Sequence, residues 1–202
     1  MPGEGKDGLV ITFDDGDSSI YRYAFPILKK YGVRAIVFLI VDYIGKDDSW
    51  DITPLGGKSP HLSWDEIYEM KEWGIVFGSH TMSHRNLTKL TAAEMAYELG
   101  ESKRALEEQL GPVDCISYPF NRVNSDVVRR VKQAGYEFGF GGTGESDLLI
   151  KKEAVYITDN IRSLSTKISE RPRILYGYDR IKQRIINYFT ITTMLMKKQS
   201  KV

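Results

Sequence analysis

Two short segments of this chain carry side chains of the kinds that bind metal ions and move protons. Asp14 and Asp15 follow an apolar run, and two adjacent carboxylates repel each other unless a cation or a proton lies between them. His80 and His84 are two of the chain's three histidines, and side chains four residues apart share one face of a helical turn. Either signal alone also fits a turn or a chance pair. Together they predict one site for a divalent metal ion.

The chemistry predicted for such a site is hydrolysis of an amide or an ester. One aspartate and two histidines leave coordination positions open for water and substrate, which is typical of a catalytic metal. The ion lowers the pKa of its bound water and polarises a carbonyl oxygen, and the second carboxylate can take the proton of that metal-bound water. The two aspartates can differ in role only if the backbone turns there, which Gly16 permits.

The composition suits one globular domain and excludes several classes of protein. The chain has 202 residues, 42% of them hydrophobic, enough for a sizeable core. Its 28 Lys and Arg against 27 Asp and Glu leave a net charge of +1, which disfavours a nucleic-acid partner. The single cysteine, Cys115, excludes an internal disulfide and a Cys-rich metal site. Any metal must therefore be held by His, Asp or Glu.

The sequence as given leads us to expect neither a targeting segment nor a membrane span. Residues 1–7 are polar, and the apolar run that follows is far shorter than the hydrophobic region of a signal peptide. The apolar stretches are too short or too interrupted to cross a bilayer. The sequence as it stands predicts a cytoplasmic protein, or an extracellular or cell-envelope one if it is a trimmed part of a longer chain.

Strand-like and helix-like segments alternate along the first two thirds of the chain. The patterns predict strands over 8–13, 33–41, 75–79, 115–118 and 136–140, and helices over 18–31, 64–73, 91–110 and 125–134. Pro26 should kink or interrupt the first helix, and residues 42–60 form a long irregular stretch. This β-α repeat predicts a parallel sheet, open or closed into a barrel. Beyond Gly144 we expect a strand at 154–157, helices at 161–169 and 174–196, and a tail at 197–202.

Three strings in this order resemble the motifs of the polysaccharide deacetylases, the NodB-homology group also called carbohydrate esterase family 4. They are Thr-Phe-Asp-Asp-Gly at 12–16, Ser-His-Thr-Met-Ser-His at 79–84 and, as a partial match, Ser-Tyr-Pro-Phe-Asn at 117–121. The resemblance covers about residues 9–142. It implies a distorted (β/α) barrel with fewer than eight parallel strands, here as one catalytic domain over 1–202.

The resemblance also implies roles for individual residues. Asp14 is then the general base, and Asp15, His80 and His84 are the metal ligands. The usual ion is zinc, with cobalt, manganese and nickel as alternatives. The substrate is an N-acetylglucosamine-containing polysaccharide such as a chitooligosaccharide, peptidoglycan or poly-N-acetylglucosamine, and the products are acetate and a free amine.

Other site residues are expected from their types and positions. The backbone N–H of Phe120 can hold the oxyanion, which needs no particular side chain. Trp50 and Tyr118 are candidates for stacking on sugar rings.

The chain departs from the family pattern at two places. Ser117 stands where many members have an arginine that steadies the catalytic aspartate, and the candidates to replace that cation are Arg122, Lys151, Lys152 and Arg162. No histidine follows His84 to act as a general acid, and His61 is expected to be a surface residue. Either another group donates the proton, Asp14 returns the one it took, the acid comes from a segment missing from this chain, or the enzyme is slow.

Two alternatives stay open. One is a hydrolase of a non-peptide C–N bond in a small molecule, because a fold alone does not fix the substrate. The other, which the two departures favour, is a degenerate glycan-binding domain without turnover. The expected partner is an N-acetylated glycan, and the oligomeric state is left open.

Overall fold

The computed structural model describes residues 9–46, 60–156 and 159–168. The chain divides into two compact units, Met1–Lys152 and Glu153–Val202, and each is described by itself. The motif residues lie in the first unit. One domain over residues 1–202 stays a prediction.

A sheet of five parallel strands forms the centre of the first unit. The strands are β1 (Ile11–Phe13), β2 (Ala35–Leu39), β3 (Val76–Ser79), β4 (Cys115–Ser117) and β5 (Phe138–Phe140). They lie in the order β1-β2-β3-β4-β5, and each neighbouring pair is parallel. The predicted fold, a distorted (β/α) barrel with fewer than eight parallel strands, is confirmed. Because the strands are parallel, their carboxyl ends meet at one edge, where ligand sites form in such folds.

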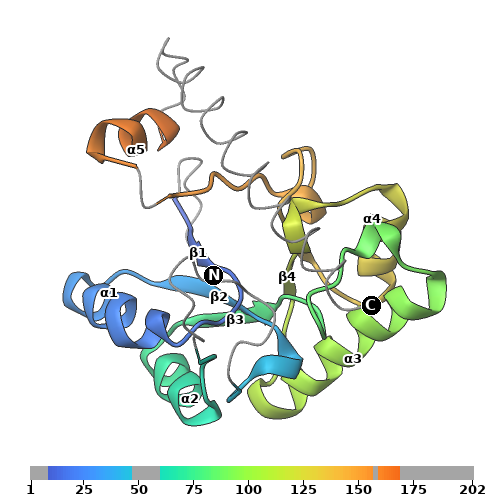
Figure 1. The fold of residues 1–202 in the computed structure, drawn as a ribbon, viewed down its shortest axis with the longest axis horizontal. Coiled ribbons are helices and arrows are strands. Elements are labelled where there is room, and N and C mark those ends of the chain that lie inside the picture. The colour runs from blue at the N-terminus through green and yellow to red at the C-terminus, as the bar shows by residue number, and fades with distance from the viewer. Residues whose placement is uncertain (1–8, 47–59, 157–158, 169–202) are drawn as a thin grey trace, which may run out of the picture. The chain divides into compact units, whose positions relative to one another are not determined.

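Helices join the strands and lie around the outer side of the sheet (Figure 1). They are α1 (Phe25–Tyr31), α2 (Trp64–Trp73), α3 (Ala92–Leu110) and α4 (Ser125–Gln133), and the second unit contains α5 (Ile161–Ile168). Short 3₁₀ segments occupy Val41–Tyr43, Leu87–Lys89, Pro119–Asn121 and Asp147–Leu149. Both predicted capping boxes are present, at Ser63 with Glu66 and at Thr91 with Glu94.

Pro26 does not break the first helix: the backbone stays helical through Ala24 and Phe25, and only the spacing of the hydrogen bonds changes there. A π-helical segment, Ile20–Ala24, precedes α1, and Pro26 lies in the first turn of α1. A proline cannot donate a backbone hydrogen bond inside a helix but is tolerated in the first turn, where the N–H has no intrahelical partner. The chain therefore changes its helical repeat just before the proline.

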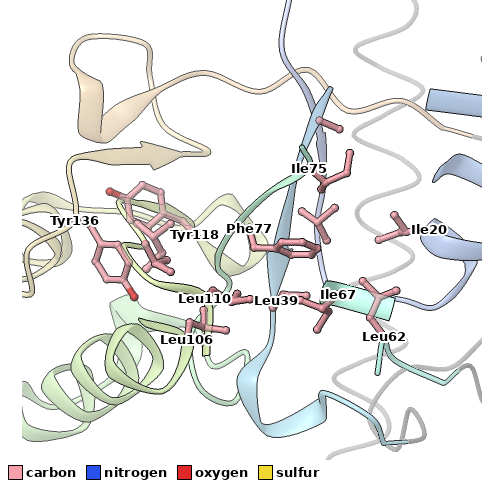
Figure 2. Close-up of a cluster of buried hydrophobic side chains, with 14 of the residues drawn as sticks. Ile20, Leu39, Leu62, Ile67, Ile75, Phe77, Leu106, Leu110, Tyr118 and Tyr136 are labelled. Carbon is pink, nitrogen blue, oxygen red and sulfur yellow. The ribbon is translucent and has the colours of Figure 1, made fainter. Parts of the chain in front are cut away.

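Alternation along the strands sorts side chains onto two faces of the sheet. Val37, Leu39, Phe77 and Ile116 belong to the large core beneath the helices, part of which Figure 2 shows. Phe38, Cys115 and Phe140, which belong to the other face, form a smaller buried cluster. This alternation also decides which way the site residues at the strand ends point.

The end of the sheet differs from the sequence prediction. Residues 154–156 form no strand, and Ile150 instead makes a single parallel bridge to Phe140. The bridge is held by hydrogen bonds from the Ile150 N–H to the Gly139 carbonyl and from the Gly141 N–H to the Ile150 carbonyl. The expected helix at 174–196 and most of the loop at 42–60 lie outside the described residues. Within the described part of the chain, no helix is long and apolar enough to cross a membrane.

Candidate active site

A tight turn at the end of β1 separates the two adjacent aspartates. Asp15 and Gly16 both have left-handed backbones, with φ of 70° and 72°. The Gly16 N–H donates to the Asp14 carbonyl at 2.9 Å, and a Cβ on Gly16 would lie 2.8 Å from Leu39 Cδ2. Glycine is therefore favoured here by the left-handed turn, and it also leaves room for the Leu39 side chain of β2. The turn lets the neighbouring carboxyl groups meet different partners, as the sequence suggested.

The two motif histidines follow β3 and are held by hydrogen bonds. His80 is buried, and its Nδ1–H donates to the Ser117 carbonyl at the end of β4, with a separation of 2.8 Å. That bond leaves Nε2 of the neutral ring free to bind a metal ion. The backbone N–H of His84 donates to Thr81 Oγ1 at 3.1 Å, which fixes the loop between the two rings.

Asp15, His80 and His84 offer ligand atoms that all lie within 4.8 Å of one another. Asp15 Oδ1 is 3.3 Å from Nε2 of His80 and 3.5 Å from Nε2 of His84. Ligands about 2.0–2.1 Å from a tetrahedral zinc ion are about 3.3 Å apart, so these separations match a shared ion. Asp15 Oδ1 is also buried without a hydrogen bond among the described residues. A buried oxygen without a partner is costly, and a cation would satisfy it. The three residues fit a metal ion.

The electrostatics of the three ligands depend on one another. Burial raises the pKa of Asp15, but the nearby imidazoles, above all His80, outweigh it and hold that pKa below the usual value. Burial, together with the charge of His80, lowers the pKa of His84 to about 4. Burial also opposes protonation of His80, yet Asp15 and Asp14 raise its pKa above the usual 6.5. At neutral pH, His84 is thus neutral and Asp15 is ionised, both ready to act as ligands.

Asp14 meets a cation instead of the histidines. Its Oδ2 accepts a hydrogen bond from Lys152 Nζ at 2.6 Å, and the same ammonium donates to Ser117 Oγ at 2.7 Å. Lys152, one of the four candidates, thus supplies the cation next to Asp14 that Ser117 cannot supply. Asp14 Oδ1 is buried and makes no hydrogen bond within the described structure.

The expectation for His61 was wrong, because this residue is buried. Its Nδ1–H donates to the Asp15 carbonyl at 2.9 Å, and its ring lies 5.3 Å from that of Tyr43. The neighbouring Leu62 N–H donates to the Gly16 carbonyl at 2.8 Å. Residues just before α2 therefore brace the turn that carries the two aspartates.

Of the two predicted sugar-stacking residues, the structure describes only Tyr118. Tyr118 is fully buried and its hydroxyl donates to the Leu148 carbonyl at 2.6 Å, so its ring is part of the core and is not free to stack on a sugar (Figure 2). The reason is alternation: Ser117 points to the site, and the next side chain points to the helices. Trp50 lies outside the described residues.

Phe120 lies beside the metal-ligand set. Its ring is partly exposed, and the ring centroid is 4.6 Å from that of His84. Its backbone N–H remains the predicted donor to the oxyanion.

Backbone strain is concentrated at the site. Five non-glycine residues in the described part of the chain have a positive φ: Asp15, Thr81, His84, Phe120 and Asn121. All five follow the carboxyl ends of β1, β3 or β4, and Thr81 is a β-branched residue, for which this conformation is rare. Strain of this kind persists only where the surrounding structure enforces it, and it is common at active sites.

Comparisons with known proteins agree with this geometry. The family model described as "Polysaccharide deacetylase" matches residues 3–139. The chain is 31% identical to YxkH of Bacillus subtilis (strain 168) over 155 residues, which are 76% of this chain and 50% of that protein. It is 30% identical over 145 residues to a poly-beta-1,6-N-acetyl-D-glucosamine N-deacetylase of Staphylococcus aureus (strain MRSA252), covering 67% of this chain and 48% of that protein. The chain thus spans about half the length of these relatives.

Solved structures show the same fold. A polysaccharide deacetylase from Bacillus cereus matches with a TM-score of 0.63 and 32% identity, over 79% of this chain and 51% of that one. The Streptococcus pyogenes deacetylase PplD matches with a TM-score of 0.69 and 24% identity, over 82% and 72% of the two chains. From the family model, the relatives and the shared arrangement of strands, the chain belongs to the polysaccharide deacetylase family.

Proposed function

We propose that this chain is a metal-dependent hydrolase that removes N-acetyl groups from an N-acetylglucosamine-containing polysaccharide. The observation that carries this proposal is the division of labour at the carboxyl edge of the sheet. The rings of His80 and His84 face the buried Oδ1 of Asp15, which makes no hydrogen bond among the described residues, while Asp14 lies next to them with Lys152 as its cation. Family membership and the Staphylococcus relative support a glycan substrate.

The metal ion would be held by Asp15, His80 and His84, with zinc as the first candidate and cobalt, manganese or nickel as others. When bound, such an ion lowers the pKa of water and polarises the acetamide carbonyl. The donor set of one carboxylate and two imidazoles suits all of these ions.

Asp14 acts as the general base in this proposal. Its carboxylate takes a proton from the water whose oxygen attacks the carbonyl carbon of the acetamide. The Phe120 N–H donates to the oxygen that becomes negative. When the C–N bond breaks, Asp14 returns its proton to the leaving nitrogen, and acetate and a free amine result. We assign the return to Asp14 because it is the group that has just taken up that proton.

The test is acetate release from N-acetylglucosamine oligomers of increasing length. The protein is stripped of metal and reloaded with zinc, cobalt, manganese or nickel, and β-1,4-linked oligomers, β-1,6-linked oligomers and peptidoglycan fragments are compared. We expect release that requires metal and becomes faster with chain length, because distant sugar-binding contacts can contribute to lowering the barrier.

Two results would contradict the proposal. Metal-dependent hydrolysis confined to small C–N substrates would indicate the small-molecule alternative. Glycan binding without acetate release, from folded protein with its metal bound, would indicate a non-catalytic binding domain.

A further inference from the structure

A buried glutamate on helix α3 contacts the loop that carries both motif histidines. Glu98 is only 2% exposed, and its carboxyl group accepts hydrogen bonds from the Ser83 backbone N–H at 2.9 Å and from the Ser83 hydroxyl. Ser83 immediately precedes His84. The glutamate is thus one residue removed from a proposed metal ligand, although it lies on a different element.

A second contact of the same kind lies one helical turn further along α3. Ser102 is buried, and its Oγ accepts a hydrogen bond from Ser79 Oγ at 3.0 Å. Ser79 immediately precedes His80. Glu98 and Ser102 are four residues apart and therefore share one face of α3, just as Ser79 and Ser83 are four residues apart in the loop. Two residues on one face of α3 therefore form hydrogen bonds with the residues that precede His80 and His84.

The loop between these two contacts is strained and depends on them. Thr81 and His84 have φ of 69° and 59°, which favours glycine. The Thr81 N–H donates to Ser79 Oγ at 3.0 Å, so the serine held by α3 also ties down the first strained residue. Such conformations persist only where the surroundings impose them.

Fold stability alone does not explain a carboxyl group at this position. Met95, Leu99 and Leu106 on the same helix are buried and apolar. Among the described residues, no basic side chain forms an ion pair with Glu98. Burying a carboxyl group is costly unless it is hydrogen-bonded, and an apolar side chain could fill such a position without that cost. What the carboxyl group adds is two acceptor oxygens directed at Ser83.

We propose that Glu98 is a positioning residue, which fixes the loop so that His80 and His84 can bind one metal ion. Ser102 supports the same loop at its other end. This inference rests on the proposed metal site, and it concerns the affinity and geometry of that site.

The test compares zinc affinity, by competition with a chelator, in the wild type and in Glu98→Ala, Glu98→Gln and Ser83→Ala. We expect Glu98→Ala to weaken zinc binding about ten- to hundredfold, the usual effect of losing a group that orients a metal ligand. Glu98→Gln keeps one acceptor oxygen and should recover part of that loss. Glu108→Ala is the matched control, because Glu108 lies on the same helix but is exposed and pairs with Arg104. It should bind zinc as the wild type does.

A second readout separates positioning from a general loss of stability. The absorption spectrum of the cobalt-loaded protein reports the geometry around the ion, and it should change in Glu98→Ala at a temperature where circular dichroism shows the protein folded. Unchanged zinc affinity together with an unchanged cobalt spectrum in that variant would overturn the inference. If Glu98→Ala does not fold, unchanged zinc affinity in both Glu98→Gln and Ser83→Ala overturns it equally.

The wild-type protein distinguishes this inference from the proposed function. Zinc binding that Glu98→Ala weakens, without acetate release from any oligomer, would support the positioning role and contradict the deacetylase activity. A wild type that binds neither zinc nor cobalt would contradict both.

Discussion

The two halves of the site balance charge in different ways, although they begin at adjacent residues. We call Asp15, His80 and His84 the ligand half, and Asp14, Ser117 and Lys152 the base half. In the base half, the carboxyl of Asp14 is 2.6 Å from an ammonium supplied by the chain itself. In the ligand half, a buried Asp15 oxygen faces two imidazoles and makes no hydrogen bond among the described residues. Two aspartates with the same side chain therefore have different neighbours, because the backbone turns between them.

The largest effect should come from breaking the ligand half. His80→Ala and His84→Ala each remove one of three ligands, so we expect loss of both bound zinc and acetate release. Metal content after gel filtration and the rate of release measure the two effects. Full metal occupancy in either variant would remove that histidine from the ligand half.

Breaking the base half should separate turnover from metal binding. Asp14→Asn keeps the shape of the side chain but cannot take a proton, so we expect acetate release to fall by about a hundredfold or more. Zinc content should stay at the wild-type level. An equal loss of zinc would show that Asp14 belongs to the ligand half.

A smaller effect is expected from replacing Lys152, the cation of the base half. Lys152→Met leaves Asp14 without its charged partner, and we expect acetate release to fall about ten- to hundredfold with little change in zinc binding. Lys152→Arg keeps the charge and should retain more activity than the methionine variant. Equal activities of the two variants would show that the charge of Lys152 is not what matters.

The smallest effect is a dependence of zinc affinity on pH. A metal ion binds the neutral imidazole, so it must displace the proton of His80, whose pKa is raised above 6.5 by Asp15 and Asp14. Affinity should fall as pH decreases through that raised pKa, by about tenfold per pH unit for one proton. His84, with a pKa of about 4, adds no such dependence near neutral pH. Zinc titrations between pH 5 and pH 9 measure the slope, and a flat profile would contradict protonation of His80.

Much of the ligand half and most of the fold could be predicted from the sequence, because their signals are local. The β-α repeat predicted the parallel sheet, and the capping boxes predicted the starts of α2 and α3. The spacing of His80 and His84 predicted that their side chains lie together, although residues 80–86 form a loop and not the helical turn on which that prediction was based. Tyr118 could also have been placed correctly, since alternation through Cys115, Ile116 and Ser117 puts its ring on the helix side.

The contacts that complete the site could not be predicted, because they join residues distant in the chain. Lys152 is 138 residues from Asp14, and Glu98 is 15 residues from Ser83. No periodicity links such pairs; only the folded sheet and helices bring them together. The burial of His61 could not be predicted for the same reason, since its ring contacts the Asp15 carbonyl, 46 residues earlier in the chain.

The non-glycine residues with a positive φ after the strands lower the stability of the fold, and two of them belong to the proposed metal site. A non-glycine residue in this conformation costs about 1–2 kcal/mol, a cost that glycine does not carry. Glycine in place of Asp15 or His84 would therefore relax the backbone and at the same time delete a proposed metal ligand. Selection for a more stable fold alone would favour losing these side chains, as expected where activity requires a strained site. At Asp15 and His84, the backbone cost is therefore what the chain would bear in exchange for the proposed metal site.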